Sequence, residues 1–228
     1  MHTYMKSTRE KTGAAPFKIS DTRERILDAA LNLISEKGYL GTSTREIARR
    51  VGIAELTIFR HFGSKEKLFE CVLKKYTFLP RLKELMPQLH SLPYEDSLVL
   101  VGLRFLETLK ERKSLCRIML SEITVYPEKA KDLYKDFIDE ILKILADYFK
   151  TLQAKGTLKK ELSPFVAARA FLGTIHSYFL AEEILKNRSI SKKEARKVVG
   201  ELADIFANGS LGGADKIHLK GVDRRGRE

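Results

Sequence analysis

The chain has 228 residues, with 42 Lys and Arg against 30 Asp and Glu, so its formal net charge is +12. This surplus favours a polyanionic partner, of which nucleic acid and an anionic membrane surface are the usual two. The hydrophobic content of 43% is typical of globular proteins, and a chain of this length needs neither disulfides nor a structural metal to bury a core.

Three further features narrow the class of protein. No signal-peptide pattern occurs near the first residue, and the longest apolar run, Leu98 to Leu103, falls far short of the roughly 20 residues of a membrane-spanning helix. Cys71 and Cys116 lie in apolar stretches without a second Cys or His at ligand spacing, so we interpret them as buried hydrophobic residues. We therefore expect a cytoplasmic protein with no membrane partner, no metal and no cofactor.

The first predicted helix begins at Ser20 and Asp21, where Ser20 can cap it, and ends at Gly38. Two short helices follow. Ser43 and Glu46 form a capping box at the start of the second, which stops at Gly52. A third helix runs from about residue 54 to 62, and two short helices across a tight glycine turn are typical of a helix-turn-helix unit.

A fourth helix is predicted to start at Lys65, to bury Leu68, Phe69, Val72 and Leu73, and to be halted by Pro80. Beyond it, helical periodicity recurs and no strand-like alternation competes. The remaining predicted helices are Tyr94 to Arg112, Ser114 to Val125, Pro127 to Lys155, Ser163 to Asn187 and Ser191 to Asn208. The sequence therefore predicts an all-α fold.

A run of motifs between Asp21 and Phe69 carries the functional signal. It consists of Gly41-Thr42-Ser43-Thr44-Arg45-Glu46-Ile47-Ala48, Val51-Gly52-Ile53, Thr57-Ile58-Phe59-Arg60-His61-Phe62 and Ser64-Lys65-Glu66-Lys67-Leu68. These residue types, at these offsets, resemble the signature of the TetR family of bacterial transcriptional regulators. The resemblance implies a repressor that binds a palindromic operator in double-stranded DNA as a homodimer and is released by a small apolar or amphipathic effector.

We expect the chain to divide into four parts. Residues 1–19 form a flexible arm, and residues 20–66 form a three-helix helix-turn-helix domain that binds DNA. The fourth helix joins this domain to a helical ligand-binding and dimerisation domain at residues 67–208. Residues 209–228 form a flexible basic tail.

The implied DNA contacts lie on the second and third helices and at the start of the fourth. Thr44 is expected to bind phosphate, and Arg45 to read a base, plausibly guanine through O6 and N7. Thr57 and His61 are expected to contact the DNA backbone. The full set is Ser43, Thr44, Arg45, Glu55, Leu56, Thr57, Phe59, Arg60, His61 and Lys65, with Lys65 as a further phosphate contact.

Three positions depart from the family pattern and make the groove-facing surface bulkier and more apolar. Ala54 replaces a small polar cap, Leu56 replaces a small residue or proline, and Phe59 replaces a tyrosine and so lacks a hydroxyl that would bind phosphate. Arg60 could supply the missing phosphate contact. Glu55 could accept a hydrogen bond from cytosine N4, or it could repel non-cognate DNA.

The last two predicted helices carry apolar stripes that the family uses in a four-helix dimer interface. The expected interface residues are Phe165, Ala168, Leu172, His176, Phe179, Val198, Val199, Leu202, Ile205 and Phe206. For any single one of them, the alternative is a place in the core of the protomer. This holds above all for the imidazole of His176, which lies among apolar neighbours and is more often a core residue than a ligand contact.

The resemblance further implies an effector cavity in the second domain, although an apolar stripe of this kind is more often plain core. The residues expected to line it are Phe69, Val72, Tyr76, Phe105, Leu109, Met119, Ile123, Phe137, Ile138, Leu142, Phe171, Ile175 and Tyr178. The fourth helix, with Tyr76, is the candidate lever between the two domains.

Other functions receive less support from the sequence. A phosphate loop, a nucleophile elbow and a separated pair of catalytic acids do not occur, and Glu182 with Glu183, like Asp136, Asp139 and Glu140, is interpreted as part of a solvated helix face. An enzyme is therefore not expected. A DNA-binding architectural protein that reads no sequence needs only charge, but the large apolar second domain argues against it. Activation instead of repression remains open.

Overall fold

The computed structural model describes residues 19–210 except residue 126, and it describes side chains except at 19–20, 122–134, 136 and 210. The expected flexible arm and tail lie outside these residues, apart from Ile19, Gly209 and Ser210, which belong to terminal helices. The expected effector contact Ile123 also falls outside the described side chains.

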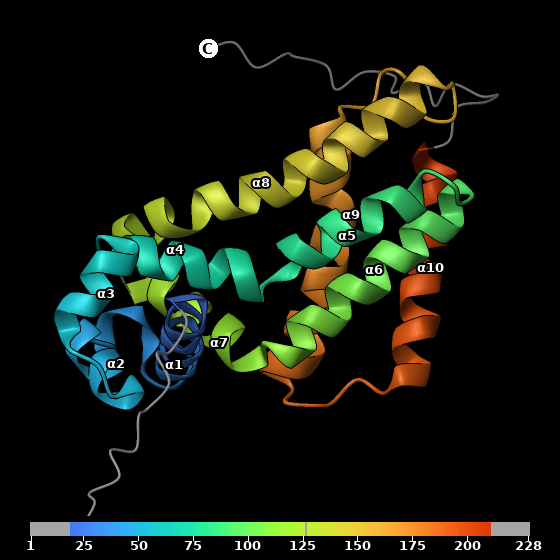
Figure 1. Cartoon of the computed structure of the whole chain (residues 1–228). Coiled ribbons are helices and arrows are strands. Elements are labelled where there is room, and N and C mark those ends of the chain that lie inside the picture. The colour runs from blue at the N-terminus through green and yellow to red at the C-terminus, as the bar shows by residue number, and fades with distance from the viewer. Residues whose placement is uncertain (1–18, 126, 211–228) are drawn as a thin grey trace, which may run out of the picture.

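The described residues form an all-helical structure, which confirms the predicted fold class. Figure 1 shows the first three helices gathered at one end of the molecule, with the last helix at the other. The helices are α1 (Ile19–Gly41), α2 (Thr44–Val51), α3 (Glu55–Phe62), α4 (Lys65–Tyr76), α5 (Phe78–Leu89), α6 (Tyr94–Glu111), α7 (Lys113–Val125), α8 (Pro127–Ala154), α9 (Pro164–Phe179), the π-helical turn η1 (Leu180–Leu185) and α10 (Lys192–Ser210). Among these described helices, none is long and apolar enough to span a membrane.

The N-terminal unit consists of α1 to α3 packed on the start of α4. Its core is made of side chains that recur at helical spacing. Ile26 and Leu33 of α1 are almost fully buried, as are Ile47, Ile58 and Leu68 of the helices packed around it. Removing such apolar area from water is the main favourable term in folding, so these residues hold the unit together.

Two helix boundaries differ from the sequence-based expectation. Gly38 does interrupt the first helix, with φ of 81°, but the helix resumes for a last turn that ends at Gly41. Pro80 does not halt the fourth helix, which already ends at Tyr76. It lies instead in the first turn of α5, where the N–H that proline lacks has no helical partner in any case.

The second unit is a bundle in which α6 packs against α9 and α10, and α8 packs against α5 and α9. Aromatic side chains fill its centre: the ring centroid of Phe206 lies 5.3 Å from that of Phe171 and 6.1 Å from that of Phe149. Gly102 lies where α6 comes closest to its neighbours. A Cβ atom there would fall 2.6 Å from Val199 Cγ1 and 2.9 Å from Ile175 Cδ1.

The expected helix over residues 163–187 changes character at its end, where η1 replaces regular α-helix. The interpretation of Glu182 and Glu183 as solvated is wrong, because both carboxylates are buried. Glu183 accepts hydrogen bonds from the Ile190 N–H at 2.9 Å and the Lys113 ammonium at 3.0 Å. Burial raises the pKa of Glu183, but these bonds outweigh it and the net shift is downward, so the group is charged and ties η1 to α7.

The two units also meet directly, because α1 packs along α7 as well as against α4. The polypeptide passes between the units through α4, so the expected connection is present. The contact between α1 and α7 was not expected, because the apolar periodicity of a helix does not indicate which other helix it packs against. The N-terminal unit is therefore attached to the second unit at more than the single connecting helix.

The close approach at Gly102 generates a stability prediction. Gly102→Ala should lower the free energy of unfolding by about 1–3 kcal/mol, since overpacking outweighs the gain of up to about 1 kcal/mol from replacing a helical glycine. The measurement is urea unfolding at a fixed protein concentration. Gly200→Ala on α10 is the matched control, because its Cβ would meet no atom within 4 Å and stability should be unchanged or increased. Equal effects of the two substitutions would contradict this packing.

Candidate functional site

The turn between α2 and α3 is determined by local capping. The Ser43 hydroxyl accepts from the Glu46 N–H at 3.1 Å, which is one half of the predicted capping box. The Glu46 carboxylate accepts from the Lys37 ammonium of α1. Gly52 ends α2 in the left-handed region with φ of 76°, which other residues adopt only at a cost, and its N–H donates to the Ala48 carbonyl at 2.9 Å. Arg25 of α1, which sequence reasoning missed, donates to the Val51 carbonyl at 2.6 Å and holds this end of α2 in place.

Thr44 and Glu55 contact each other. The Thr44 hydroxyl donates to the Glu55 carboxylate at 2.6 Å, which joins the first residue of α2 to the first residue of α3. Both side chains are half-buried. From the sequence, Thr44 is expected to bind phosphate, and Glu55 either to accept from a base or to repel non-cognate DNA. Those roles stay predictions, and the structure adds a direct bond between the two side chains that joins α2 to α3.

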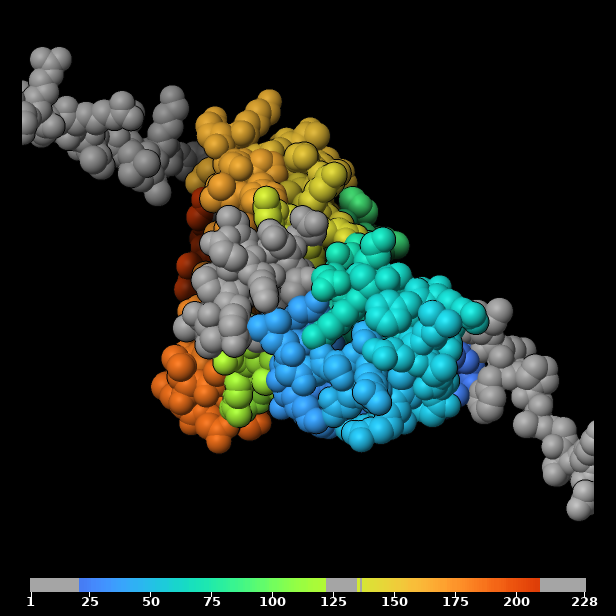
Figure 2. All heavy atoms as spheres, turned by 90° about the vertical axis from the view of Figure 1, so that its left-hand side faces the viewer, coloured from blue at the N-terminus to red at the C-terminus, as the bar shows by residue number. Residues whose placement is uncertain are grey.

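The outer face of α3 is unusually apolar for a helix that lies in water. Leu56 is 59% exposed and Phe59 is 42% exposed, and Arg60 beside them is also exposed. Ile58 and Phe62 point the other way and are buried, as a period of 3.6 residues requires. Thr57 and His61 are half-buried, and Arg45 on α2 is exposed. Figure 2 views the molecule from this end and shows the first helices as one continuous lobe.

Lys65, at the start of α4, has a partner that was not foreseen. Its ammonium lies 4.3 Å from the centroid of the Tyr39 ring. The Tyr39 hydroxyl in turn donates to Glu66 at 2.9 Å, and its ring lies 4.9 Å from that of Phe69. Spacing along the chain did not indicate this contact, because it joins the end of α1, after the kink at Gly38, to the start of α4.

A cavity of about 320 Å³ lies between α5, α6, α7, α8 and α9. Six of the residues expected to line it do so: Phe105, Leu109, Met119, Phe137, Ile138 and Leu142. Four others, namely Phe69, Val72, Phe171 and Ile175, are buried in the core and are not part of its wall. The remaining two are bound elsewhere, because the Tyr76 hydroxyl donates to Asp28 and the Tyr178 hydroxyl donates to Glu194 at 2.7 Å.

The polar groups of this cavity were missed by sequence reasoning. Arg112, Arg169 and His176 line it together with Thr108, although His176 was assigned to the dimer interface. Burial lowers the pKa of His176, so its imidazole is neutral near neutral pH. Leu172, also expected in the interface, lines the cavity as well. The spacing of these residues along the chain does not predict that they line one cavity, because they come from separate helices.

The expected dimer face divides into exposed and buried positions. Ile205 is 69% exposed and Phe165 is 39% exposed, whereas Ala168, Phe179 and Val199 are buried within the protomer. Val198, Leu202 and Phe206 are half-buried. The buried residues of the set therefore belong to the core of the bundle and can support a partner only from beneath the surface.

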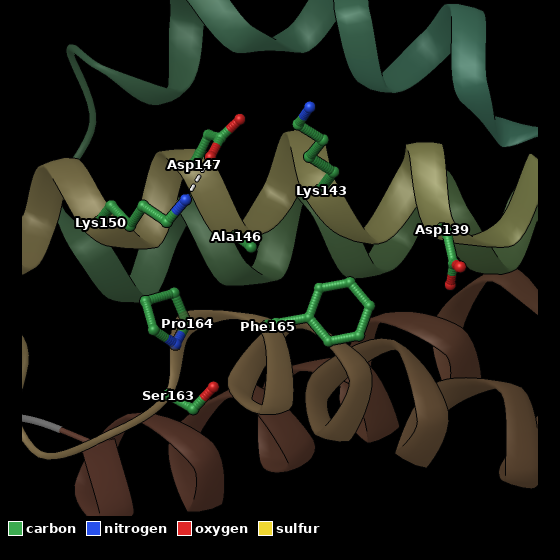
Figure 3. Close-up of a pocket in the computed structure, with 8 residues that line it drawn as sticks. All are labelled: Asp139, Lys143, Ala146, Asp147, Lys150, Ser163, Pro164 and Phe165. Atoms are coloured by element: carbon green, nitrogen blue, oxygen red, sulfur yellow. Dashed lines mark hydrogen bonds and ion pairs between the residues drawn. The ribbon is translucent and has the colours of Figure 1, made fainter. Parts of the chain in front are cut away.

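A second hollow, of about 420 Å³, runs along the surface between α8 and the start of α9. Figure 3 shows the ring of Phe165 lying between the two helices, while Lys143 and Asp147 point away from α9. Lys150 donates to Asp147 at 2.8 Å on the rim. The floor of this hollow is thus apolar and its rim is charged.

The chain matches known proteins in both units. Residues 26–72 match the model of bacterial regulatory proteins of the tetR family, and residues 96–209 match that of the C-terminal domain of AefR-like transcriptional repressors. The HTH-type transcriptional regulator YvkB of Bacillus subtilis is 30% identical over 188 residues, an alignment that covers 82% of this chain and 96% of YvkB.

Solved structures share the fold. A TetR-family transcriptional regulator from Mesorhizobium loti has a TM-score of 0.67 at 21% identity, covering 86% of this chain and 99% of that one. The regulator FadR from Bacillus subtilis in complex with stearoyl-CoA has a TM-score of 0.63 at 19% identity, covering 82% and 98%. The family expected from the motifs is confirmed. Its helix-turn-helix domain and its C-terminal domain are both accounted for, and the chain belongs to the TetR family of bacterial transcriptional regulators.

Proposed function

We propose that the protein is a repressor that binds a palindromic operator as a homodimer and is released by a small amphipathic effector. The observation that carries this proposal is the outer face of α3, which presents Leu56, Phe59 and Arg60 to solvent from the second helix of a helix-turn-helix. An exposed apolar pair is costly in water unless a partner covers it. The major groove, where thymine displays a methyl group, is such a partner for a recognition helix.

The contacts of each half-site follow from this placement. Arg45, exposed on α2, is proposed to read guanine, and Thr57 and His61 to contact the DNA backbone with Ser43 and Arg60. Lys65, held over the Tyr39 ring at the start of α4, is proposed as a further phosphate contact. The bond between Thr44 and Glu55 supports a positioning role for that pair, because it fixes α3 relative to α2.

Dimerisation is proposed to use α9 and α10. Phe165 and Ile205 leave apolar area exposed on adjacent helices, and Val198 and Leu202 are only half-buried. A second copy of the chain would cover this area about a two-fold axis. The two recognition helices would then face half-sites about one helical turn of DNA apart, roughly 34 Å.

Release by an effector is proposed to act through the cavity between α5 and α9. Its volume of about 320 Å³ lies in the range of small-molecule sites. The structure of FadR holds stearoyl-CoA, a ligand with an apolar chain and a charged end, and a ligand of that general character suits a cavity with apolar walls and basic groups. The effector must bind more tightly to the arrangement that fits DNA poorly, since only differential affinity shifts a population.

Sequence-specific binding should depend on Arg45 and Thr57. Selection from random duplex DNA should enrich a palindrome, and Arg45→Ala or Thr57→Ala should weaken its binding by about tenfold or more. Arg104→Ala on α6, an exposed arginine far along the chain from the helix-turn-helix, is the control and should leave binding unchanged. Failure to enrich any sequence, together with a steep salt dependence on all DNA, would favour the architectural alternative instead.

Leu56 should contact the methyl group of a thymine in the operator. Replacing a contacted thymine of the selected operator with uracil removes only a methyl group, and it should weaken binding by about fourfold, the value of one buried methyl. In Leu56→Ala, the same replacement should have little further effect at the position that Leu56 covers. Leu185→Ala, an exposed leucine in η1, is the control that should keep full sensitivity to uracil. Uniform sensitivity in all three proteins would show that Leu56 does not read the methyl.

The dimer interface on α10 should be sensitive to a buried charge. Ile205→Asp should weaken the dimer by about 100-fold or more, because it would bury an unpaired carboxylate in an apolar interface. Sedimentation of the full chain over a range of concentrations measures this change. Leu56→Asp places the same charge on the exposed face of α3 and should leave the dimer intact. A dimer that tolerates Ile205→Asp would move the interface away from α10.

A further inference from the structure

We infer that the cavity binds an amphipathic anion, that the acidic group of this ligand contacts Arg112, and that this contact links the ligand to α1 of the DNA-binding unit. The inference rests on the proposed effector function and adds to it the chemical class of the ligand and the residue that reports its presence. It is carried by the placement of Arg112, which lines the cavity and at the same time binds the end of α4.

The described part of the cavity wall carries positive charge and no negative charge. Among the described residues that line it, Arg112 and Arg169 are cationic, and none is an aspartate or a glutamate. The other walls are apolar, with Phe105, Met119 and Leu142 among them. Such a lining fits a ligand with a hydrocarbon part and a single acidic group, because a cation without a fixed counter-charge in a half-buried site favours an anion.

The two arginines differ in how far neighbouring carboxylates neutralise them. Arg169 lies 3.8 Å from the Asp139 carboxylate. Arg81, which also approaches the cavity residue Thr108, is paired with Glu111 at 2.9 Å. For Arg112, by contrast, the described side chains supply no carboxylate partner. Arg112 is therefore the basic group of the wall that is best suited to a ligand acid.

The geometry of Arg112 leaves its fork-shaped end suitable for this task. Its Nε–H donates to the Tyr76 carbonyl at 3.1 Å, and the guanidinium carbon lies 5.3 Å from the centroid of the Tyr76 ring. That hydrogen bond uses one of the five N–H donors of a guanidinium. The terminal pair of nitrogens is the part that binds a carboxylate or phosphate through two parallel hydrogen bonds.

Tyr76 extends the connection to the DNA-binding unit. It is the last residue of α4, and its hydroxyl donates to the carboxylate of Asp28 in the middle of α1. Tyr76 is thus bound through its carbonyl by Arg112, the residue that follows α6, and is bound to α1 through its hydroxyl. A ligand acid that draws the guanidinium towards the cavity changes the first bond, so α4 and α1 can take up a different position relative to α6.

The test measures binding of straight-chain fatty acids from hexanoate to dodecanoate and of the matched alcohols to the full chain by calorimetry. The acid should bind about tenfold or more tightly than the alcohol of equal length, as expected for hydrogen bonds to a charged group. Arg112→Gln should remove this preference by weakening acid binding far more than alcohol binding, and Arg112→Lys should restore part of it. Arg104→Gln on the exposed face of α6 is the matched control and should behave as the unaltered protein.

A second measurement tests the link to α1. Tyr76→Phe keeps the carbonyl that Arg112 binds but removes the hydroxyl that binds Asp28. This variant should bind the acid with unchanged affinity, while the acid-induced loss of operator affinity should become several-fold smaller. Full release of the operator by acid in Tyr76→Phe would overturn the link.

The outcomes separate this inference from the proposed function. Alcohols that bind and release the operator as well as acids do would leave the effector function standing and overturn the anionic ligand. Binding of neither series, while the operator is still bound, would overturn both the anionic ligand and the effector role of the cavity, but not the DNA-binding function. A preference for acids that persists in Arg112→Gln would overturn the role of Arg112.

Discussion

The arrangement of the protein depends on the burial of α1 on more than one side. Ile26, Ala30 and Leu33 belong to the core that α1 shares with the other helices of the DNA-binding unit, and α1 also packs along α7 of the second unit. A helix with so wide an apolar surface cannot leave either unit without exposing that surface to water. The position of the helix-turn-helix is therefore coupled to the position of α7, and α7 forms one wall of the cavity.

Polar contacts help to set the angles between helices that apolar packing alone does not determine. Dispersion and burial are not directional, so they hold α1 near α4 without determining a unique angle. The bond from Tyr76 to Asp28 and that from Thr44 to Glu55 are directional, and each joins two helices at one point. Exchanging one such hydrogen bond costs far less than opening a core, so these two contacts are the more easily rearranged part of the helix packing.

The local structure of the helix-turn-helix could be predicted from the sequence, but the contact between its two helices could not. The spacing of Ser43, Glu46 and Gly52 depends on contacts within a few residues, so the capping and the turn were predictable, and both are present. The same spacing placed Thr44 and Glu55 near DNA without indicating that they bind each other. Their bond depends on the angle between α2 and α3, which the turn and the packing beneath both helices set together.

The sequence by itself determined the all-α fold, the helix-turn-helix and the family, because periodicity, caps and glycine turns are local properties of the chain. Only the tertiary structure decided which apolar stripes are core and which line a cavity. It also showed that Glu183 is buried beside Lys113 and that Arg112 faces the cavity, since each of these contacts joins separate elements of the chain. The role of a side chain at such a contact depends on the residues of the opposite helix, and the spacing of residues along one helix does not indicate which helix lies opposite.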